Sequence, residues 1–157
     1  MRQAVGEAAI PRVAELRAEL ASHASALCSR LSPVTAPGGA ARLHQLVNDS
    51  SSFAETSSTA MLVWSLAWAL ESQLLAPDDR YTTCLTSAWE GVAAAVQADG
   101  SVVGICQGMP IWPNATKYKS MAQAYEASAC GGLGSVLSAA AAMESLARSA
   151  APAARRR

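Results

Sequence analysis

Apolar side chains recur at steps of three and four residues through the first thirty positions. The stripe consists of Ile10, Val13, Leu16, Leu20, Ala24, Leu27 and Leu31. Such spacing is typical of one face of an amphipathic helix. It predicts a helix from about Val5 to Leu31, with its strong part after Pro11 because proline fits the first turn of a helix.

The apolar pattern widens in the segment from Phe53 to Leu70. Its second half is apolar on nearly every side, which predicts a helix that is buried on most of its surface. Small polar residues precede that half and can cap the start of the helix. Trp64 and Trp68 fall on this helix, and we expect both rings in the core.

Two further helices are predicted, from about Arg80 to Ala98 and from about Ser135 to Ser149. The first carries Trp89 on its apolar stripe, so this ring is also expected in the core. The glycine-rich segment from Cys130 to Gly134 precedes the second helix and predicts a flexible bend.

Short extended runs and loops separate the helices. Arg42–Val47 and Ser101–Cys106 each predict a short strand. Gly108–Asn114 contains two prolines and Trp112 and predicts an irregular loop. Lys117–Glu126 fits neither a helix nor a strand pattern. The chain is thus expected to form helical hairpins with short extended segments in the loops.

The composition fits one folded domain with a high helical content. The chain has 157 residues, 51% of them hydrophobic, and it is rich in alanine, the strongest helix former. This length suits a single domain, which we place at residues 1–150, followed by a basic tail at residues 151–157. The predicted fold class is all-α.

The charge balance limits the partners. Twelve basic and twelve acidic residues give a formal net charge of zero, which argues against nucleic acid because phosphate binding needs a basic face. No apolar run approaches the ~20 residues that span a bilayer, which argues against a membrane partner. The first residues lack the apolar core of a signal peptide. Either the chain is intracellular or Met1 is not the original start, so the compartment is left open.

Four cysteines, Cys28, Cys84, Cys106 and Cys130, are spread along the chain. None forms a C-x-x-C pair, which excludes a zinc ribbon. We interpret all four as small buried hydrophobic residues. A single bridge from Cys106 to Cys130 is the alternative if the protein is secreted.

The residues alone reveal no catalytic machinery. The sequence lacks G-x-S-x-G, H-E-x-x-H and P-loop motifs. A triad from His44, Asp49 and a loop serine can be drawn, but nothing fixes its geometry. Asp49 and Glu55 are interpreted as solvated or capping carboxylates. Trp112, in its loop next to proline, is the best candidate for a ring on which a sugar could stack.

Five sequence blocks nevertheless resemble, in the same order, those of the unsaturated rhamnogalacturonyl hydrolases of glycoside hydrolase families 105 and 88. His44–Asp49 and Ser52–Met61 together resemble "WHQVLD…SYxETSxTAM". The other four blocks are Trp89–Gly91 against "AWxGL", Asp99–Gly108 against "DGxVxGVCxGT", Tyr118 and Tyr125 against "YY", and Gly131–Ala139 against "GxGAFLLA". Leu43 replaces the tryptophan of "WHQ", which weakens sugar stacking there, and Met109 replaces the threonine of "GT".

The resemblance implies part of an (α/α)6 toroid, a closed ring of six helical hairpins of the six-hairpin glycosidase type. A complete toroid needs more than twice this length, and the blocks belong to its carboxyl-terminal part. The catalytic aspartate of the family lies upstream, and no residue here matches it. The resemblance therefore assigns no catalytic residue and no metal ligand to this chain. It also implies no cofactor.

In the resembled family, that aspartate acts as general acid and base. It hydrates the enol ether of a Δ4,5-unsaturated galacturonyl residue on pectin (rhamnogalacturonan) oligosaccharides. By their place in the blocks, His44 and Gln45 are expected to bind the saccharide together with Trp112. Glu55 and Thr56 are expected to brace the start of a helix. This chain without the aspartate is expected to be inactive.

Two alternatives stay open. One is a non-catalytic helical binding module, since part of a ring leaves apolar flanks uncovered and such flanks favour self-association. The other is a toroid enzyme with a different substrate.

Overall fold

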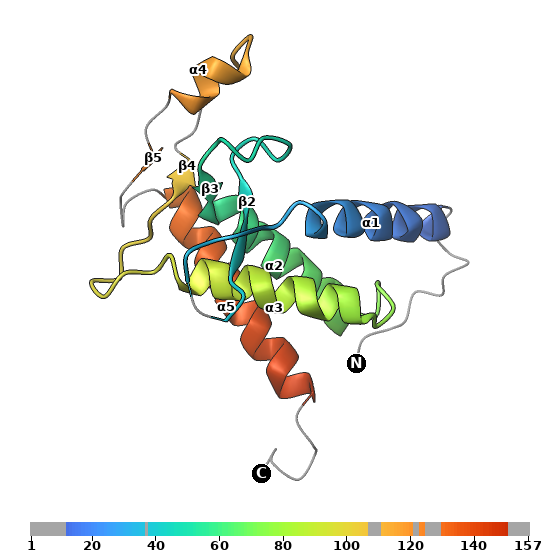
Figure 1. Ribbon diagram of the computed structural model, residues 1–157. Helices are drawn as coiled ribbons and strands as arrows, with labels where there is room; N and C mark the ends of the chain where they lie inside the picture. Colours follow the sequence, from blue (N-terminus) through green and yellow to red (C-terminus); the bar gives the residue numbers. More distant parts are fainter. Residues whose placement is uncertain (1–11, 37, 107–110, 121–122, 125–129, 151–157) are drawn as a thin grey trace.

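The computed structural model describes residues 12–36, 38–106, 111–120, 123–124 and 130–150 (Figure 1). The helices are α1 (Val13–Cys28), α2 (Thr56–Glu71), α3 (Asp79–Ala93), α4 (Ala115–Lys119) and α5 (Cys130–Ala150). The strands are β1 (Ser32–Pro33), β2 (Ala41–His44), β3 (Ala54–Glu55), β4 (Ile105–Cys106) and β5 (Gln123–Ala124). Helices dominate and the strands are short, which confirms the predicted fold class.

The core lies around α2, which packs against α5 on one side and α3 on the other. Small and β-branched side chains let these helices approach closely. The buried residues of α2 are Thr56, Thr59, Ala60, Leu62, Val63, Leu66, Ala67 and Ala69. A three-stranded antiparallel sheet, ordered β1-β2-β3, covers the start of α2, and β4 pairs with β5.

The prediction that Trp64 and Trp68 lie in the core is wrong, because both rings lie on the outer face of α2. Trp64 is 50% exposed and Trp68 is 54% exposed. A helix that is apolar on nearly every side does not indicate which face its neighbours cover, and here one face lies outside the packing with α3 and α5. The two rings line a cavity of about 380 Å³ together with Leu20, Ser65 and Ala69. Trp89, in contrast, is half-buried and packs against the core.

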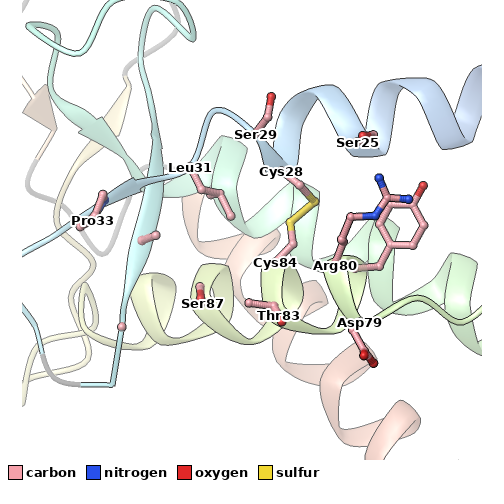
Figure 2. A pocket seen from close by; sticks show the side chains of 13 residues that line it. Ser25, Cys28, Ser29, Leu31, Pro33, Asp79, Arg80, Thr83, Cys84 and Ser87 are labelled. Carbon is pink, nitrogen blue, oxygen red and sulfur yellow. A yellow bond between two sulfur atoms is a disulfide. The ribbon is translucent and has the colours of Figure 1, made fainter.

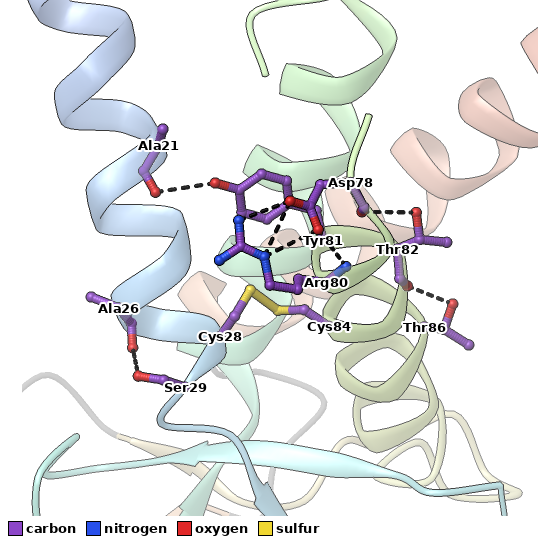
Figure 3. The surroundings of a disulfide bond; sticks show 10 residues. All are labelled: Ala21, Ala26, Cys28, Ser29, Asp78, Arg80, Tyr81, Thr82, Cys84 and Thr86. Carbon is purple, nitrogen blue, oxygen red and sulfur yellow. Dashed lines mark hydrogen bonds and ion pairs between the residues drawn. A yellow bond between two sulfur atoms is a disulfide. The ribbon is translucent and has the colours of Figure 1, made fainter. Parts of the chain in front are cut away.

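The cysteine interpretation is also wrong for Cys28 and Cys84, which form a disulfide. The bond joins the last residue of α1 to α3 (Figure 3). Cys106 keeps its thiol, so the suggested bridge to Cys130 is absent. The two bonded residues are 56 positions apart, and only the tertiary packing of α1 on α3 brings them together.

The predicted bend at Cys130–Gly134 is instead the beginning of α5. A Cβ on Gly132 would lie 2.3 Å from Cδ1 of Ile105. The glycine therefore allows α5 to approach β4 closely, and it does not break the helix.

Other boundaries shift by a few residues. The predicted strand at Arg42–Val47 is β2, which ends at His44. The helix expected to run to Ala98 ends at Ala93. Beyond it Val96 bridges Val102. Residues 1–11 and the predicted tail at 151–157 lie outside the described residues. Within the described part of the chain, no helix has both the length and the apolar character needed to cross a membrane.

Candidate saccharide-binding site

His44 lies at the end of β2, where antiparallel pairing sets it opposite Ala54. Its Nδ1 is 2.6 Å from the carbonyl oxygen of Ser52. A carbonyl oxygen can only accept a hydrogen bond, so Nδ1 carries a proton. In the neutral ring Nε2 then keeps its lone pair and can accept a hydrogen bond from a hydroxyl group.

Gln45 connects this strand end to two other segments. Its Nε2 donates to the carbonyl oxygen of Tyr118 at 3.4 Å and lies 3.8 Å from Sγ of Cys106. Burial raises the pKa of the Cys106 thiol, so this sulfur is protonated at neutral pH. Gln45 thus joins β2 to β4 and to α4.

Trp112 lies next to α4 and is held by it. The Trp112 backbone N–H donates to Oη of Tyr118 at 3.0 Å. Nζ of Lys117 lies 4.9 Å from the centre of the indole ring, a cation–π contact. The indole Nε1 is buried without a hydrogen-bond partner among the described residues. This donor is therefore unsatisfied, and one ring face is covered by an ammonium group.

A polar contact joins α4 to the loop between β2 and β3. The ammonium group of Lys119 pairs with the carboxylate of Asp49 and donates to Oγ of Ser51. Hydrogen bonds from Lys119 and then from Ser51 lower the pKa of Asp49 to about 2. Asp49 is thus an ion-paired loop residue.

Glu55 is buried, with 3% of its surface exposed. Its carboxylate accepts hydrogen bonds from the N–H groups of Ser57 and Ser58, from Oγ of Ser57 and from the N–H of Cys106. The side chain therefore caps α2 and fastens β4 to it, which confirms the predicted bracing role. Thr56 contributes too, because its hydroxyl donates to the carbonyl oxygen of Val103 and accepts from Arg42.

The structure connects Gln45 and Trp112 through Tyr118, because Gln45 contacts the Tyr118 backbone and Trp112 contacts its hydroxyl. His44 precedes Gln45 directly along the chain, and its ring contacts the carbonyl oxygen of Ser52 instead. Sequence reasoning missed the roles of Lys117 and Lys119. The sequence feature that could have revealed them is Asn114, a residue type that often caps the start of a helix. Its side chain caps α4 by accepting a hydrogen bond from the N–H of Lys117.

The arrangement offers hydrogen-bonding and aromatic groups, which suit binding better than bond cleavage. Among the described residues, no cluster of three or more His, Cys, Asp or Glu side chains could hold a metal ion. A separate cavity of about 740 Å³ lies between α1, the β1–β2 region and α3 (Figure 2). None of the three predicted binding residues lines it.

Three solved structures share this helical fold. A possible member of the GH105 family from Salmonella enterica subsp. enterica serovar Paratyphi A has a TM-score of 0.67 and 17% identity, covering 86% of this chain and 32% of that one. A possible GH105 member from Klebsiella pneumoniae subsp. pneumoniae gives 0.69 and 18%, covering 94% and 34%. A glycosyl hydrolase family 88 protein from Bacteroides vulgatus gives 0.63 and 22%, covering 92% and 38%. At these identities the likeness shows the fold, which is that of a helical glycosidase.

The profile of Glycosyl Hydrolase Family 88 matches residues 8–147. The match covers most of the sequence, and the chain therefore belongs to Glycosyl Hydrolase Family 88. No curated protein matches it. The chain spans about a third of the length of the solved proteins it resembles.

Proposed function

We propose that this chain is part of a glycoside hydrolase that removes Δ4,5-unsaturated galacturonyl residues from rhamnogalacturonan oligosaccharides. The observation that supports this best is that Tyr118 joins Gln45 to Trp112. His44 and Gln45 lie in a block that resembles the hydrolases, Trp112 lies in the loop between two such blocks, and the groups of all three suit a saccharide. The reaction would be hydration of the enol ether by an aspartate acting as general acid and base. That aspartate would come from a part of the enzyme outside this sequence.

Each binding residue has a role that its contacts allow. Nε2 of His44 would accept a hydrogen bond from a sugar hydroxyl, because its other nitrogen is committed to Ser52. Gln45 would position α4 beside the sugar through its bond to the Tyr118 carbonyl. Trp112 would offer the ring face that Lys117 does not cover. The ammonium group of Lys117 also complements the carboxylate of a uronyl sugar.

The binding role can be tested by titrating the isotope-labelled full chain with an unsaturated rhamnogalacturonan disaccharide, monitored by NMR. We expect shifts at His44 and Trp112 and up to about a tenfold loss of affinity in His44→Ala, the effect of one lost hydrogen bond. His23→Ala is the matched control, since His23 is exposed on α1. Equal affinity in the two variants would contradict the assigned role of His44.

The isolated chain is expected to bind without turning over the substrate. Hydration of the double bond removes its ultraviolet absorbance, so the absorbance of the disaccharide should stay constant when the purified chain is added. A steady loss that His44→Ala abolishes would show that these residues form an active site without the upstream aspartate.

A second candidate function is that of a helical interaction module. The exposed rings of Trp64 and Trp68, with Leu20, form an apolar groove between α1 and α2. A second copy of the chain could cover this groove, because exposed apolar patches favour association. Sedimentation of the parent chain and of the Trp64→Ser/Trp68→Ser variant tests this. A concentration-dependent dimer lost in the variant supports the module, and a parent chain that stays monomeric contradicts it.

A further inference from the structure

Helix α1 has little apolar packing with the rest of the domain. Among its residues, all of them described, only Ala24 is buried. Leu16 is 57% exposed. Four other residues of α1 are only partly buried against the core, namely Leu20, Ala21, Leu27 and Cys28. A helix that buries so little apolar surface gains little free energy from docking.

The side of α1 that faces α3 lines the cavity of about 740 Å³, which is open to solvent (Figure 2). Ser25, Cys28 and Ser29 line it from α1 and its end, while Thr83, Cys84 and Ser87 line it from α3. Empty space between two helices removes the dispersion contacts that would otherwise hold them. Between the two helices, Oη of Tyr81 donates a long side-chain hydrogen bond to the carbonyl oxygen of Ala21, at 3.3 Å.

The Cys28–Cys84 disulfide crosses this sparsely packed junction (Figure 3). It joins the carboxyl end of α1 to the first half of α3, and Cys84 itself is buried. The bond closes a loop between residues 56 positions apart, and a loop of that length gives a large entropic restraint on the unfolded chain. The covalent bond is therefore the strongest connection between α1 and α3.

We propose that the Cys28–Cys84 disulfide is a redox-sensitive fastening of α1, and that the chain acquires it in an oxidising compartment. On formation, the two thiols give up two electrons and two protons to an acceptor disulfide, which becomes a dithiol. A small dithiol reductant reverses the exchange, leaving two cysteine thiols and its own disulfide. Reduction then releases α1 and widens the cavity, while α2, α3 and α5 stay packed.

The compartment follows from the chemistry of the bond. Structural disulfides form and persist outside the reducing cytosol. This inference is independent of the saccharide site, because none of the residues at the junction belongs to that site. Loss of sugar binding would therefore leave it standing.

Hydrogen exchange on the full chain tests the fastening. The protein is produced in a bacterial periplasm and measured by mass spectrometry before and after treatment with dithiothreitol. Loss of the restraint on the unfolded chain lowers protection to a similar extent in α2 and α5. We expect protection in α1 to fall by about tenfold or more beyond this common decrease, because α1 also opens locally. The variant Cys106→Ser, which lacks a thiol outside the disulfide, should respond as the parent does.

Three results would overturn the proposal. One is alkylation of Cys28 and Cys84 as thiols in the native chain before any reductant is added. Another is unchanged protection of α1 after complete reduction. The third is an equal fall of protection in α1, α2 and α5, because the bond would then act only on unfolding of the whole domain and not on α1 in particular. The Cys28→Ser/Cys84→Ser variant gives a second measurement without a reductant, and it should match the reduced parent.

Discussion

The two sides of the candidate site are held in different ways. On the side of β2 and α2, the contacts are buried: Glu55 is 3% exposed, and Thr56 and Thr59 are fully buried. On the side of α4, the ion pair of Lys119 with Asp49 joins side chains that are about one-third exposed. α4 also stands away from the main body of helices (Figure 1).

This difference separates the proposed binding residues into two kinds. His44 and Gln45 extend from a strand fixed by buried hydrogen bonds, which are costly to break because the groups left behind would be unsatisfied. Trp112 and Lys117 depend on a short helix held by exposed polar contacts, which contribute little to stability. The β2–α2 side is expected to define the geometry of the site, and the α4 side to adapt to what binds there.

The largest effect is expected for Glu55→Ala. This change leaves the partly buried N–H groups of Ser57, Ser58 and Cys106 without their acceptor, so we expect the free energy of unfolding to fall by about 3 kcal/mol. Glu71→Ala is the matched control at the other end of α2, where the carboxylate is exposed and accepts from the hydroxyls of Ser145 and Ser149. Urea unfolding followed by circular dichroism measures both. Equal losses of unfolding free energy in the two variants would contradict the inference that the buried contacts of Glu55 hold this side of the site.

The next largest effect is expected where α3 meets β2. A Cβ on Gly91 would lie 2.1 Å from the carbonyl oxygen of Ala41, so Gly91→Ala must push β2 away from α3. We expect a loss of about 1–3 kcal/mol, as for other overpacked sites. Gly134→Ala, in α5 with no atom near the added methyl group, should instead be neutral or stabilising by up to about 1 kcal/mol. The same unfolding assay compares them.

The smallest effect on stability is expected for Asp49→Asn. The unfolding midpoint should match that of the parent, while amide exchange in α4 should become faster. In the parent, Lys119 depresses the pKa of Asp49 from its usual 3.8 to about 2. The carboxylate therefore supports α4 fully above the usual pKa, and that support is lost as the pH falls toward 2.

An NMR titration of the folded chain from pH 5 to pH 2 follows this change. Signals of Lys119 and Trp112 should move in the parent and stay fixed in Asp49→Asn. Movement in both proteins would mean that another group controls α4.

Much of the fold could be predicted because local patterns determine it. The small polar residues before the apolar run indicated a capped helix, and Glu55 does cap α2. The turn residues around Asp49 indicated a loop, and the loop is there. His44 and Gln45 were placed by a sequence block, and the structure sets them at a strand end next to that helix.

The errors all concern tertiary contacts. Trp64 and Trp68 belong to a helix that is apolar on nearly every side, so its sequence does not indicate which side is buried. The positions of the neighbouring helices show that both rings are exposed. Cys28 and Cys84 pair because α1 lies on α3, which their separation along the chain does not reveal. Gly132 was predicted to lie in a bend before the helix, but it lies within α5, where the absence of a side chain allows close contact with Ile105.

The placement of the four tryptophans has a spectroscopic consequence. Two indoles, Trp64 and Trp68, already face water in the folded chain, so their emission changes little when the chain unfolds. A change of emission on unfolding is therefore expected mainly from Trp89 and Trp112, which are half-buried in the folded chain. Trp64 and Trp68 are well suited to report docking, because any surface that covers them will shift their emission to shorter wavelength while the helices stay intact.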